Sequence, residues 1–204
     1  MSKLTSVQDA VKLIKDGDTV AFGGFVGAVH AEEVTAGIQA SFLETAHPKD
    51  LTVVYAAGQG DGKEKGLNHL GEEGLVKRIV GGHWGLVPRL QKLALENKLS
   101  AYNLPQGVIS HLFRDIAAGK MGVLTHVGLK TFADPRLEGG KINDISKKDI
   151  DLVKVVNIEG EERLLYKAFP INVGIIRATY ADTQGNCTME HEGALAETLA
   201  IAQA

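Results

Sequence analysis

The strongest constraint on the fold is a regular alternation of short β-prone runs and helical segments along the chain up to Ala118. Strands are predicted at the following runs: Thr19–Phe22, Leu51–Ala56, Arg78–Val80 and Ala101–Asn103. Apolar residues at helical spacing predict helices between and around them: Val7–Ile14, Ala31–Leu43, Pro88–Glu96 and Gln106–Ala118. Such alternation favours an α/β domain with an open, mostly parallel sheet and helices on both faces.

The later part of the chain has a different character. A turn-rich stretch, Asp134–Lys148, precedes three strand candidates at Leu152–Ile158, Glu162–Tyr166 and Val173–Ala178. With little helical sequence between them, these strands are expected to add some antiparallel pairing.

The whole chain, residues 1–204, is expected to form one domain. Its 204 residues, 44% of them hydrophobic and 23% charged, suit a single globular core. A last helix is predicted at Gly193–Gln203, and the sequence stops just after it without a capping residue. We therefore expect a domain that is truncated at its carboxyl end.

Charge and hydropathy argue against two classes of partner. The net charge of −3 supplies no basic field for nucleic acid. No apolar run approaches the roughly 20 residues that cross a bilayer, and the first residues lack the apolar core of a secretory signal. Neither nucleic acid nor a membrane is an expected partner.

Cysteine and histidine usage bounds the chemistry further. Cys187 is the single cysteine, so the chain can form no internal disulfide, and a cytoplasmic location is expected. None of the seven histidines forms the closely spaced pair with an acidic residue that is typical of a zinc protease helix. No metal site is expected.

A glycine-rich loop, Gly23–Gly27, joins the first predicted strand to the following helix. Glycines there permit unusual backbone dihedral angles and close approach of a ligand to main-chain N–H groups, which could hold a phosphate or an oxyanion. The loop matches neither the dinucleotide-binding fingerprint nor the Walker A loop. A ligand site and an ordinary tight turn remain equally open interpretations.

Gln106 follows Pro105 and precedes Gly107, between a predicted strand and a predicted helix. Its amide could donate a hydrogen bond into a cleft at the carboxyl edge of the sheet, although a polar loop residue is the simpler interpretation.

Two further polar clusters have ordinary alternatives. Gly82, His83 and Trp84 could line a pocket, but a lone tryptophan beside glycines is more often a core anchor. Glu190 and Glu192 flank His191 and could serve acid–base chemistry, yet a solvated segment is the commoner case. The sequence has no serine or cysteine nucleophile motif, so residue chemistry alone names no reaction.

A set of stretches, in order along the chain, carries a family resemblance: Ala10–Phe25, Phe42–Thr45, Glu73–Arg78, Gly82–Trp84, Glu96–Lys98, Ala101–Asn103, Gln106–Gly107, His111–Ala117, Thr131–Arg136, Gly140–Ile145 and Thr179–Asp182. Together they resemble the amino-terminal half of the family I CoA-transferases, most closely the single-chain acetate/propionate branch. So many ordered matches are far more specific than one glycine loop.

The resemblance implies covalent catalysis shared between two similar domains. In that family a glutamate of the second domain attacks an acyl-CoA, giving an acyl anhydride and then a glutamyl-CoA thioester. The nucleophile would lie outside this chain, which should then be inactive alone. Coenzyme A is implied as a substrate with short carboxylic acids, and no permanently bound cofactor is expected. The implied partners are a carboxyl-terminal half or a β-subunit, with self-association into a homo-oligomer.

The resemblance also assigns roles to single residues. Gln106, followed by Gly107, matches a Gln-Gly motif whose amide helps to hold the acyl carbonyl oxygen as negative charge develops. Gly24, Phe25, Val26 and Gly27 match the loop that shapes the floor of the acyl pocket. These residues are the predicted site.

The chain departs from the family pattern just after this loop. His30 stands where many members have proline, and Glu32 stands where they have asparagine. A carboxylate facing a developing oxyanion would be unfavourable, so Glu32 is expected to face away or to be paired. His30 is expected to alter acyl-chain preference.

Two other functions are alternatives to this one. One is a non-catalytic binding or assembly module of the same fold. The other is a sugar-phosphate isomerase or sensor, which would need a basic, hydroxyl-rich phosphate loop that Gly23–Gly27 does not offer.

Overall fold

The computed structural model describes residues 2–204 and is built around a five-stranded sheet. Its strand order is β4-β3-β2-β1-β8, and every neighbouring pair is parallel. The strands are β1 (Thr19–Phe22), β2 (Leu51–Tyr55), β3 (Val76–Gly81), β4 (Ser100–Asn103) and β8 (Val173–Ile175). This arrangement confirms the predicted open, mostly parallel sheet.

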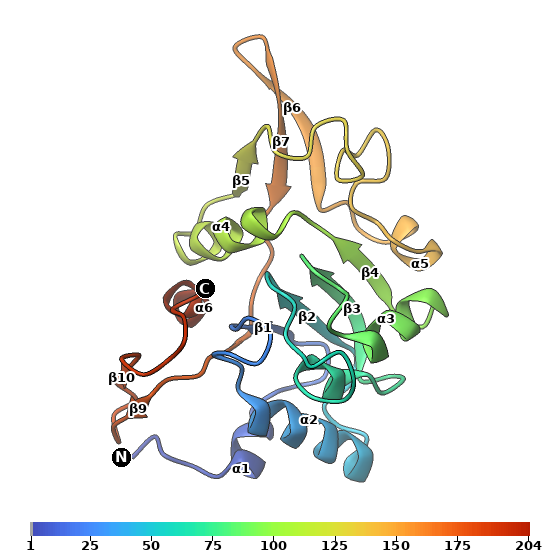
Figure 1. Cartoon of the computed structure of the whole chain (residues 1–204). Helices are drawn as coiled ribbons and strands as arrows, with labels where there is room; N and C mark the ends of the chain where they lie inside the picture. Colours follow the sequence, from blue (N-terminus) through green and yellow to red (C-terminus); the bar gives the residue numbers. More distant parts are fainter. Residues whose placement is uncertain (1) are drawn as a thin grey trace.

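Helices cover both faces of this sheet (Figure 1). One face carries α1 (Val7–Val11), α2 (Glu32–Thr45), the short 3₁₀ helix η1 (Leu67–Leu70) and α3 (Pro88–Leu95), and the other carries α4 (Gln106–Ala117) and α6 (Thr198–Gln203). The alternation of side chains along a strand explains the two cores, because successive residues point to opposite faces. In β1, Val20 and Phe22 enter the first core while Ala21 enters the second.

The long helix α4 shows why the pattern of apolar residues predicted these elements well. Val108, Ile109, Leu112 and Phe113 recur at helical spacing and are all buried against the sheet. Pro105 directly precedes the helix, and its fixed backbone angle suits that position. The start of α4 therefore places Gln106 directly after the turn that leaves β4.

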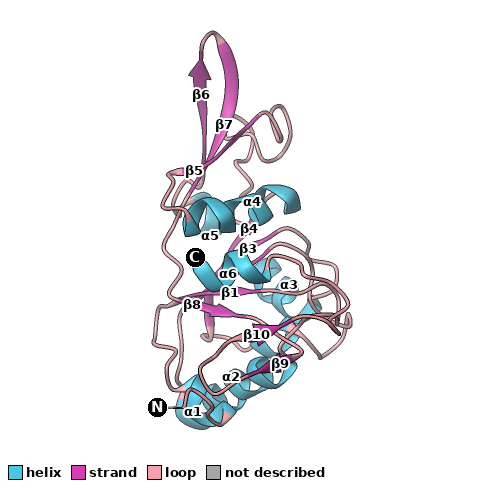
Figure 2. Ribbon diagram, turned by 90° about the vertical axis from the view of Figure 1, so that its left-hand side faces the viewer, coloured by secondary structure: helices cyan, strands magenta, loops and turns pink. Residues whose placement is uncertain are grey.

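A second, three-stranded sheet projects from the end of the molecule beyond α4 (Figures 1 and 2). It has the order β5-β7-β6 and antiparallel pairing throughout, with β5 at Gly122–Thr125, β6 at Val153–Ile158 and β7 at Glu161–Lys167. The short helix α5 (Asp144–Lys147) lies in the connection before β6. The predicted antiparallel contribution is thus confirmed for two of the three late strands.

The third late strand differs from its prediction. Val173–Ile175 pairs parallel with β1 as an edge strand of the main sheet, and the strand ends at Ile175 rather than at Ala178. The following residues form a small antiparallel ladder of β9 (Tyr180–Ala181) and β10 (Cys187–Thr188). Whether a strand pairs parallel or antiparallel depends on the neighbouring strand beside which it packs, and the strand's own sequence does not determine that neighbour.

The last helix also begins later than predicted, at Thr198 instead of Gly193. Ala196 adopts a left-handed backbone conformation (φ 43°), which no helical residue can share, and so the helix cannot extend back across it. None of the helices among residues 2–204 is long and apolar enough to span a membrane.

Candidate functional site

The five parallel strands all end at one edge of the sheet, and each is followed there by a loop. Open α/β sheets bind ligands in the crevice outside the carboxyl ends of their strands. The glycine loop follows β1, the Gly58–Gly60 turn follows β2, His83 follows β3 and Gln106 follows β4. The predicted site residues therefore lie at the same edge of the sheet, with the loops after β2 and β3 between the glycine loop and Gln106.

The glycine loop is a tight hairpin closed on itself. The N–H groups of Phe25 and Ala28 each donate to the other residue's carbonyl oxygen at 2.9 Å. At the tip, Val26 has φ 56°, a left-handed conformation that is unusual for a β-branched residue. The side chains of Phe25 and Val26 are 55% and 41% exposed, so the loop presents apolar groups to solvent.

The turn after β2 holds this hairpin in place. The Val26 N–H donates to the Gly58 carbonyl oxygen at 2.8 Å, and the Gly60 N–H donates to the Val26 carbonyl oxygen at 2.9 Å. Backbone strain of the kind seen at Val26 persists only where surrounding contacts over-determine the conformation. The two bonds from the neighbouring turn are such contacts.

A cavity of ≈ 290 Å³ opens beside the loop. It is lined by Val26, Gly27, His30, Glu32, Gly60, Asp61, Lys65, Gly66 and Arg177. Of the residues predicted for the acyl pocket, Val26 and Gly27 line it. Within the loop, Gly24 is buried and Phe25 is exposed to solvent.

Gln106 lies farther along the same edge as an exposed residue at the start of α4. Its backbone packs on Gly82, because a Cβ atom added to Gly82 would come within 2.8 Å of the Gln106 Cα atom. Gly82 in turn donates its N–H to the Tyr55 carbonyl oxygen at 3.2 Å. The loops after β3 and β2 thus stand between Gln106 and the glycine loop, and the exposed Gly107 lies beside Gln106.

Glu32, at the start of α2, is paired as expected. Its carboxylate accepts the Gly66 N–H at 2.8 Å and lies 3.0 Å from Nε2 of His69. Burial opposes ionisation of this carboxyl group, but the bonds from His69 and Gly66 outweigh burial and lower the pKa of Glu32. The ionised carboxylate of Glu32 already has hydrogen-bond partners within this chain, and so it can stay directed away from a reacting carbonyl group.

His30 is a buried residue with both ring nitrogens engaged. Nδ1 lies 2.7 Å from Oε1 of Gln59, and Nε2 lies 3.1 Å from the Thr35 hydroxyl. Burial lowers the pKa of His30, so the ring is held neutral near pH 7. One edge of the ring borders the cavity.

The other predicted clusters separate in the structure. Trp84 packs against the first core, in keeping with the core-anchor interpretation, whereas His83 is exposed. Glu190 is exposed, but Glu192 lies 3.3 Å from Arg177 with little of its side chain exposed. The two carboxylates therefore have different surroundings and do not form an acid–base pair. Among residues 2–204 no group of three or more His, Cys, Asp or Glu side chains is arranged to hold a metal ion.

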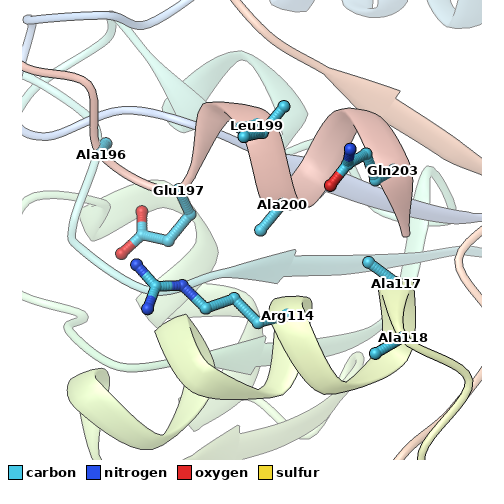
Figure 3. A pocket seen from close by; sticks show the side chains of 8 residues that line it. All are labelled: Arg114, Ala117, Ala118, Ala196, Glu197, Leu199, Ala200 and Gln203. Atoms are coloured by element: carbon cyan, nitrogen blue, oxygen red, sulfur yellow. The ribbon is translucent and has the colours of Figure 1, made fainter.

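A larger groove of ≈ 590 Å³ runs between α4 and α6 (Figure 3). Figure 3 shows Arg114 of α4 and Glu197, just before α6, on the same side of this groove, with Ala117, Ala118, Leu199, Ala200 and Gln203 along the rest of it. None of the residues predicted for the acyl pocket lines the groove.

Comparison with known proteins decides the family. Residues 4–204 match the family described as coenzyme A transferase. The chain belongs to the coenzyme A transferase family. This membership confirms the resemblance seen in the sequence.

Individual CoA-transferases resemble the chain over nearly all of its length. The caffeate CoA-transferase of Acetobacterium woodii is 45% identical over 204 residues, which are 100% of this chain and 38% of that protein. The acyl-CoA transferase YdiF of Escherichia coli O157:H7, solved as a thioester complex with CoA, is 38% identical with a TM-score of 0.96, over 100% of this chain and 40% of that one. The alpha subunit of acetate CoA-transferase from Escherichia coli K12 is 26% identical, over 93% of this chain and 76% of that subunit. The chain therefore spans about two fifths of the length of the first two relatives.

Two residues of the site escaped sequence reasoning. Gln59 stands between two glycines, yet it is fully buried behind the glycine loop, and Arg177 reaches the cavity from the segment after β8. Two glycines around a glutamine predict a turn, and they carry no signal that the side chain points inward.

Proposed function

We propose that this chain forms the amino-terminal portion of a short-chain acyl-CoA:carboxylate CoA-transferase of the acetate/propionate type. The observation that carries the proposal is the placement of the glycine loop and Gln106 on one edge of the sheet in a chain of this family. Relatives named for acetate and caffeate transfer support the reaction class. In this proposal the edge supplies one wall of the acyl site.

The proposed chemistry is covalent. A glutamate outside this chain attacks the thioester carbonyl carbon of the donor, and CoA leaves as a thiolate. The thiolate attacks the glutamyl carbonyl carbon of the resulting acyl-glutamyl anhydride, which releases the donor carboxylate and gives a glutamyl-CoA thioester. The acceptor carboxylate attacks this thioester and expels the CoA thiolate, which then attacks the acceptor carbonyl carbon of the new anhydride, forming the product thioester and freeing the glutamate. Each attack develops negative charge on a carbonyl oxygen, which needs a preorganised donor.

Gln106 is proposed as that donor. It is exposed at the carboxyl edge and begins α4, whose first N–H groups lack partners within the helix and carry partial positive charge. The side-chain amide and these N–H groups would act on the same oxygen. Gly107, without a side chain, leaves the approach open.

The glycine loop is proposed as the floor of the acyl site. Phe25 and Val26 present apolar surface suited to a short acyl chain, and the backbone of Gly27 lines the adjoining cavity. Gly24 serves the loop from behind, where only glycine fits against Gln59. In this proposal His30 tunes acyl-chain preference through the loop.

The partners follow from the same proposal. Coenzyme A is a substrate rather than a resident group, with short carboxylic acids as donor and acceptor. The match to an alpha subunit supports a second half, either a carboxyl-terminal domain or a β-subunit, and we propose further association into a homo-oligomer. The single cysteine, unpaired and exposed, suits a cytoplasmic enzyme.

The test is CoA transfer from acetyl-CoA to propionate, measured on this chain alone and with the second half supplied. Activity is expected only in the mixture, and turnover by the isolated chain would overturn the split site. In the active mixture, Gln106→Ala is expected to lower kcat by about 100-fold, as loss of one oxyanion donor does. Gln91→Ala, on the exposed face of α3, is the matched control, and equal rates for the two variants would remove Gln106 from the mechanism.

A further inference from the structure

We infer that the side chain of Gln59 is a positioning residue that ties the two ends of the glycine loop together, with His30 as its partner at the far end. The inference rests on the proposed role of that loop in the acyl site. Gln59 touches no proposed reacting atom and would act only through the loop.

The first end of the loop is held at Phe22. The Gln59 Nε2 group donates to the Phe22 carbonyl oxygen at 3.0 Å, where β1 stops and the loop begins. This bond fixes the orientation of the amide, since only its nitrogen can donate to a carbonyl oxygen. Gln59 Oε1 must therefore be an acceptor.

The second end is held at His30. Its Nδ1 lies 2.7 Å from Gln59 Oε1, so Nδ1 carries the hydrogen of the neutral ring. The ring lies nearly parallel to that of Phe22, with centroids 6.5 Å apart. One buried amide thus bridges Phe22, directly before the loop, and His30, three residues after it.

The middle of the loop rests on the same amide. Gly24 has φ 143°, and a Cβ atom placed on it would lie 2.9 Å from Gln59 Oε1 and 3.2 Å from the Ala28 carbonyl oxygen. The backbone therefore approaches the amide more closely than any residue with a side chain allows. Gln59 is 0% exposed, so water does not compete for these bonds.

The His30 ring is fixed from its other side as well. Nε2 carries no hydrogen in this tautomer, so it accepts the single hydrogen of the Thr35 hydroxyl at 3.1 Å; the hydroxyl oxygen also lies 3.0 Å from the Glu32 carbonyl oxygen. The titratable and charged groups that face the ring are Glu32, whose Oε2 lies 3.8 Å from Nε2, and, at longer range, His69 and Arg177. A ring held at both nitrogens cannot turn to release Gln59.

The loop needs such a tether because it is strained. Val26 and Val29 both adopt left-handed conformations, with φ 56° and 60°. Each such β-branched residue favours relaxation to another conformation. Without the Gln59 side chain, the loop would keep its backbone bonds to Gly58, Gly60 and Ile175, but nothing would join Phe22 to His30 through the buried amide.

A second glutamine–histidine pair provides a matched control. Gln39 Oε1 lies 2.7 Å from Nδ1 of His69, and Gln39 Nε2 donates to Glu72 at 2.7 Å. This pair has the same chemistry but joins α2 to η1 and does not touch the loop. Substitution of either glutamine by methionine keeps the volume and removes both amide bonds.

The experiment compares Gln59→Met with Gln39→Met in the active two-half enzyme. Hydrogen exchange of residues 23–29 is expected to rise about 10-fold or more in Gln59→Met and to stay unchanged in Gln39→Met. The kcat/KM for acetyl-CoA is expected to fall about 100-fold in Gln59→Met only, the loss that a misplacement of about 1 Å can cause. In ¹⁵N spectra, the hydrogen on Nδ1 of His30 is expected in the wild type and to be lost from that nitrogen in Gln59→Met.

The outcomes separate the two ideas. Faster loop exchange with unchanged turnover would uphold the positioning role and refute the acyl-site role of the loop. Unchanged loop exchange in Gln59→Met would overturn the positioning role, whatever the turnover. If Gln59→Met does not fold, His30→Phe keeps a flat ring, removes the bond to Gln59 and is subject to the same two criteria.

Discussion

The main sheet and the projecting β5-β7-β6 sheet differ in how many of their faces are buried. In the main sheet the strands are covered on both faces, and all five residues of β2 are buried. In the β5-β7-β6 sheet only one face packs into the core, through Val123, Leu164 and Tyr166, while Leu124 is 47% exposed. Parallel sheets require cover on both faces, whereas antiparallel sheets can leave one face open.

This difference explains where the candidate site lies. A parallel sheet gathers all its carboxyl ends, and hence the loops that bear Gly27 and Gln106, on one edge. An antiparallel sheet sends successive ends in opposite directions and gathers nothing. The buried main sheet also gives these loops a rigid support. Hydrogen bonds from Val26 to Gly58 and from Gln59 to Phe22 attach the glycine loop to it.

The largest expected effect tests burial in the two sheets directly. Leu51 in β2 is fully buried, so Leu51→Ala should lower the free energy of unfolding by about 3 kcal/mol through lost burial and a residual cavity. Leu124→Ala in β5 is the matched change on the exposed face and should cost about 0.5 kcal/mol or less. Urea unfolding measures both. Equal losses would mean that the open face of the projecting sheet is covered in solution.

A smaller effect is expected at the junction between the two sheets. Arg78 of β3 holds Asp149, in the connection to β6, by two bonds of 2.8 and 2.7 Å. Asp149→Asn should cost about 2 kcal/mol, because a charge-assisted pair is lost and a half-buried guanidinium is left with a weaker partner. Asp144→Asn, in the exposed pair with Lys147, should cost about 0.5 kcal/mol or less in the same assay.

The junction also predicts a pH dependence. Burial alone would raise the pKa of Asp149, but the bonds from Arg78 and the Ile150 N–H outweigh it and hold the pKa well below its usual value of 3.8. A carboxyl group of this kind stabilises the fold fully above its unfolded pKa, and the contribution disappears as the pH falls through the folded value. The difference in stability between wild type and Asp149→Asn should therefore shrink below about pH 4. A constant difference down to pH 2 would contradict the pairing.

The smallest effect compares two buried tyrosines. The hydroxyl of Tyr102 in β4 donates to the Ile150 carbonyl oxygen at 2.7 Å, and that of Tyr166 in β7 donates to the Val127 carbonyl oxygen at 2.9 Å. Burial raises the pKa of each to about 12. Each change to phenylalanine should cost about 1 kcal/mol in thermal unfolding. A much larger loss at Tyr102 would show that the junction is cooperative rather than a sum of single bonds.

The spacing of apolar residues predicted the helices and strands well wherever buried positions recur at a regular interval. The strand Thr19–Phe22 is found as predicted, and α2, α3 and α4 begin or end within two residues of their predicted limits. In these elements the apolar residues recur at the spacing of the structure, so the sequence itself indicates which positions are buried. The short elements β5 and α5 were not predicted: β5 exists through its pairing with β7, and α5 is a single turn within the turn-rich stretch Asp134–Lys148.

The candidate site residues also differ in whether a local sequence pattern predicts them. The sequence predicts a role for the glycine loop and Gln106 because they stand at strand-to-helix junctions, which the alternation marks, and this role stays a prediction. Gln59 was not found, since its importance comes from contacts with Phe22, 37 residues away, and His30, 29 residues away. No local pattern records a side chain that bridges the ends of another loop.

The sequence by itself determined the α/β class, the order of the main elements and the membership of the coenzyme A transferase family, because periodicity and ordered motifs are local properties of the chain. The tertiary structure alone decided that β8 runs parallel beside β1, that Glu32 is hydrogen-bonded to His69 and Gly66, and that Gln59 lies beneath the glycine loop. These features depend on distances between segments remote in sequence. Folding sets such distances through the packing of the whole core, and no short stretch of residues encodes them.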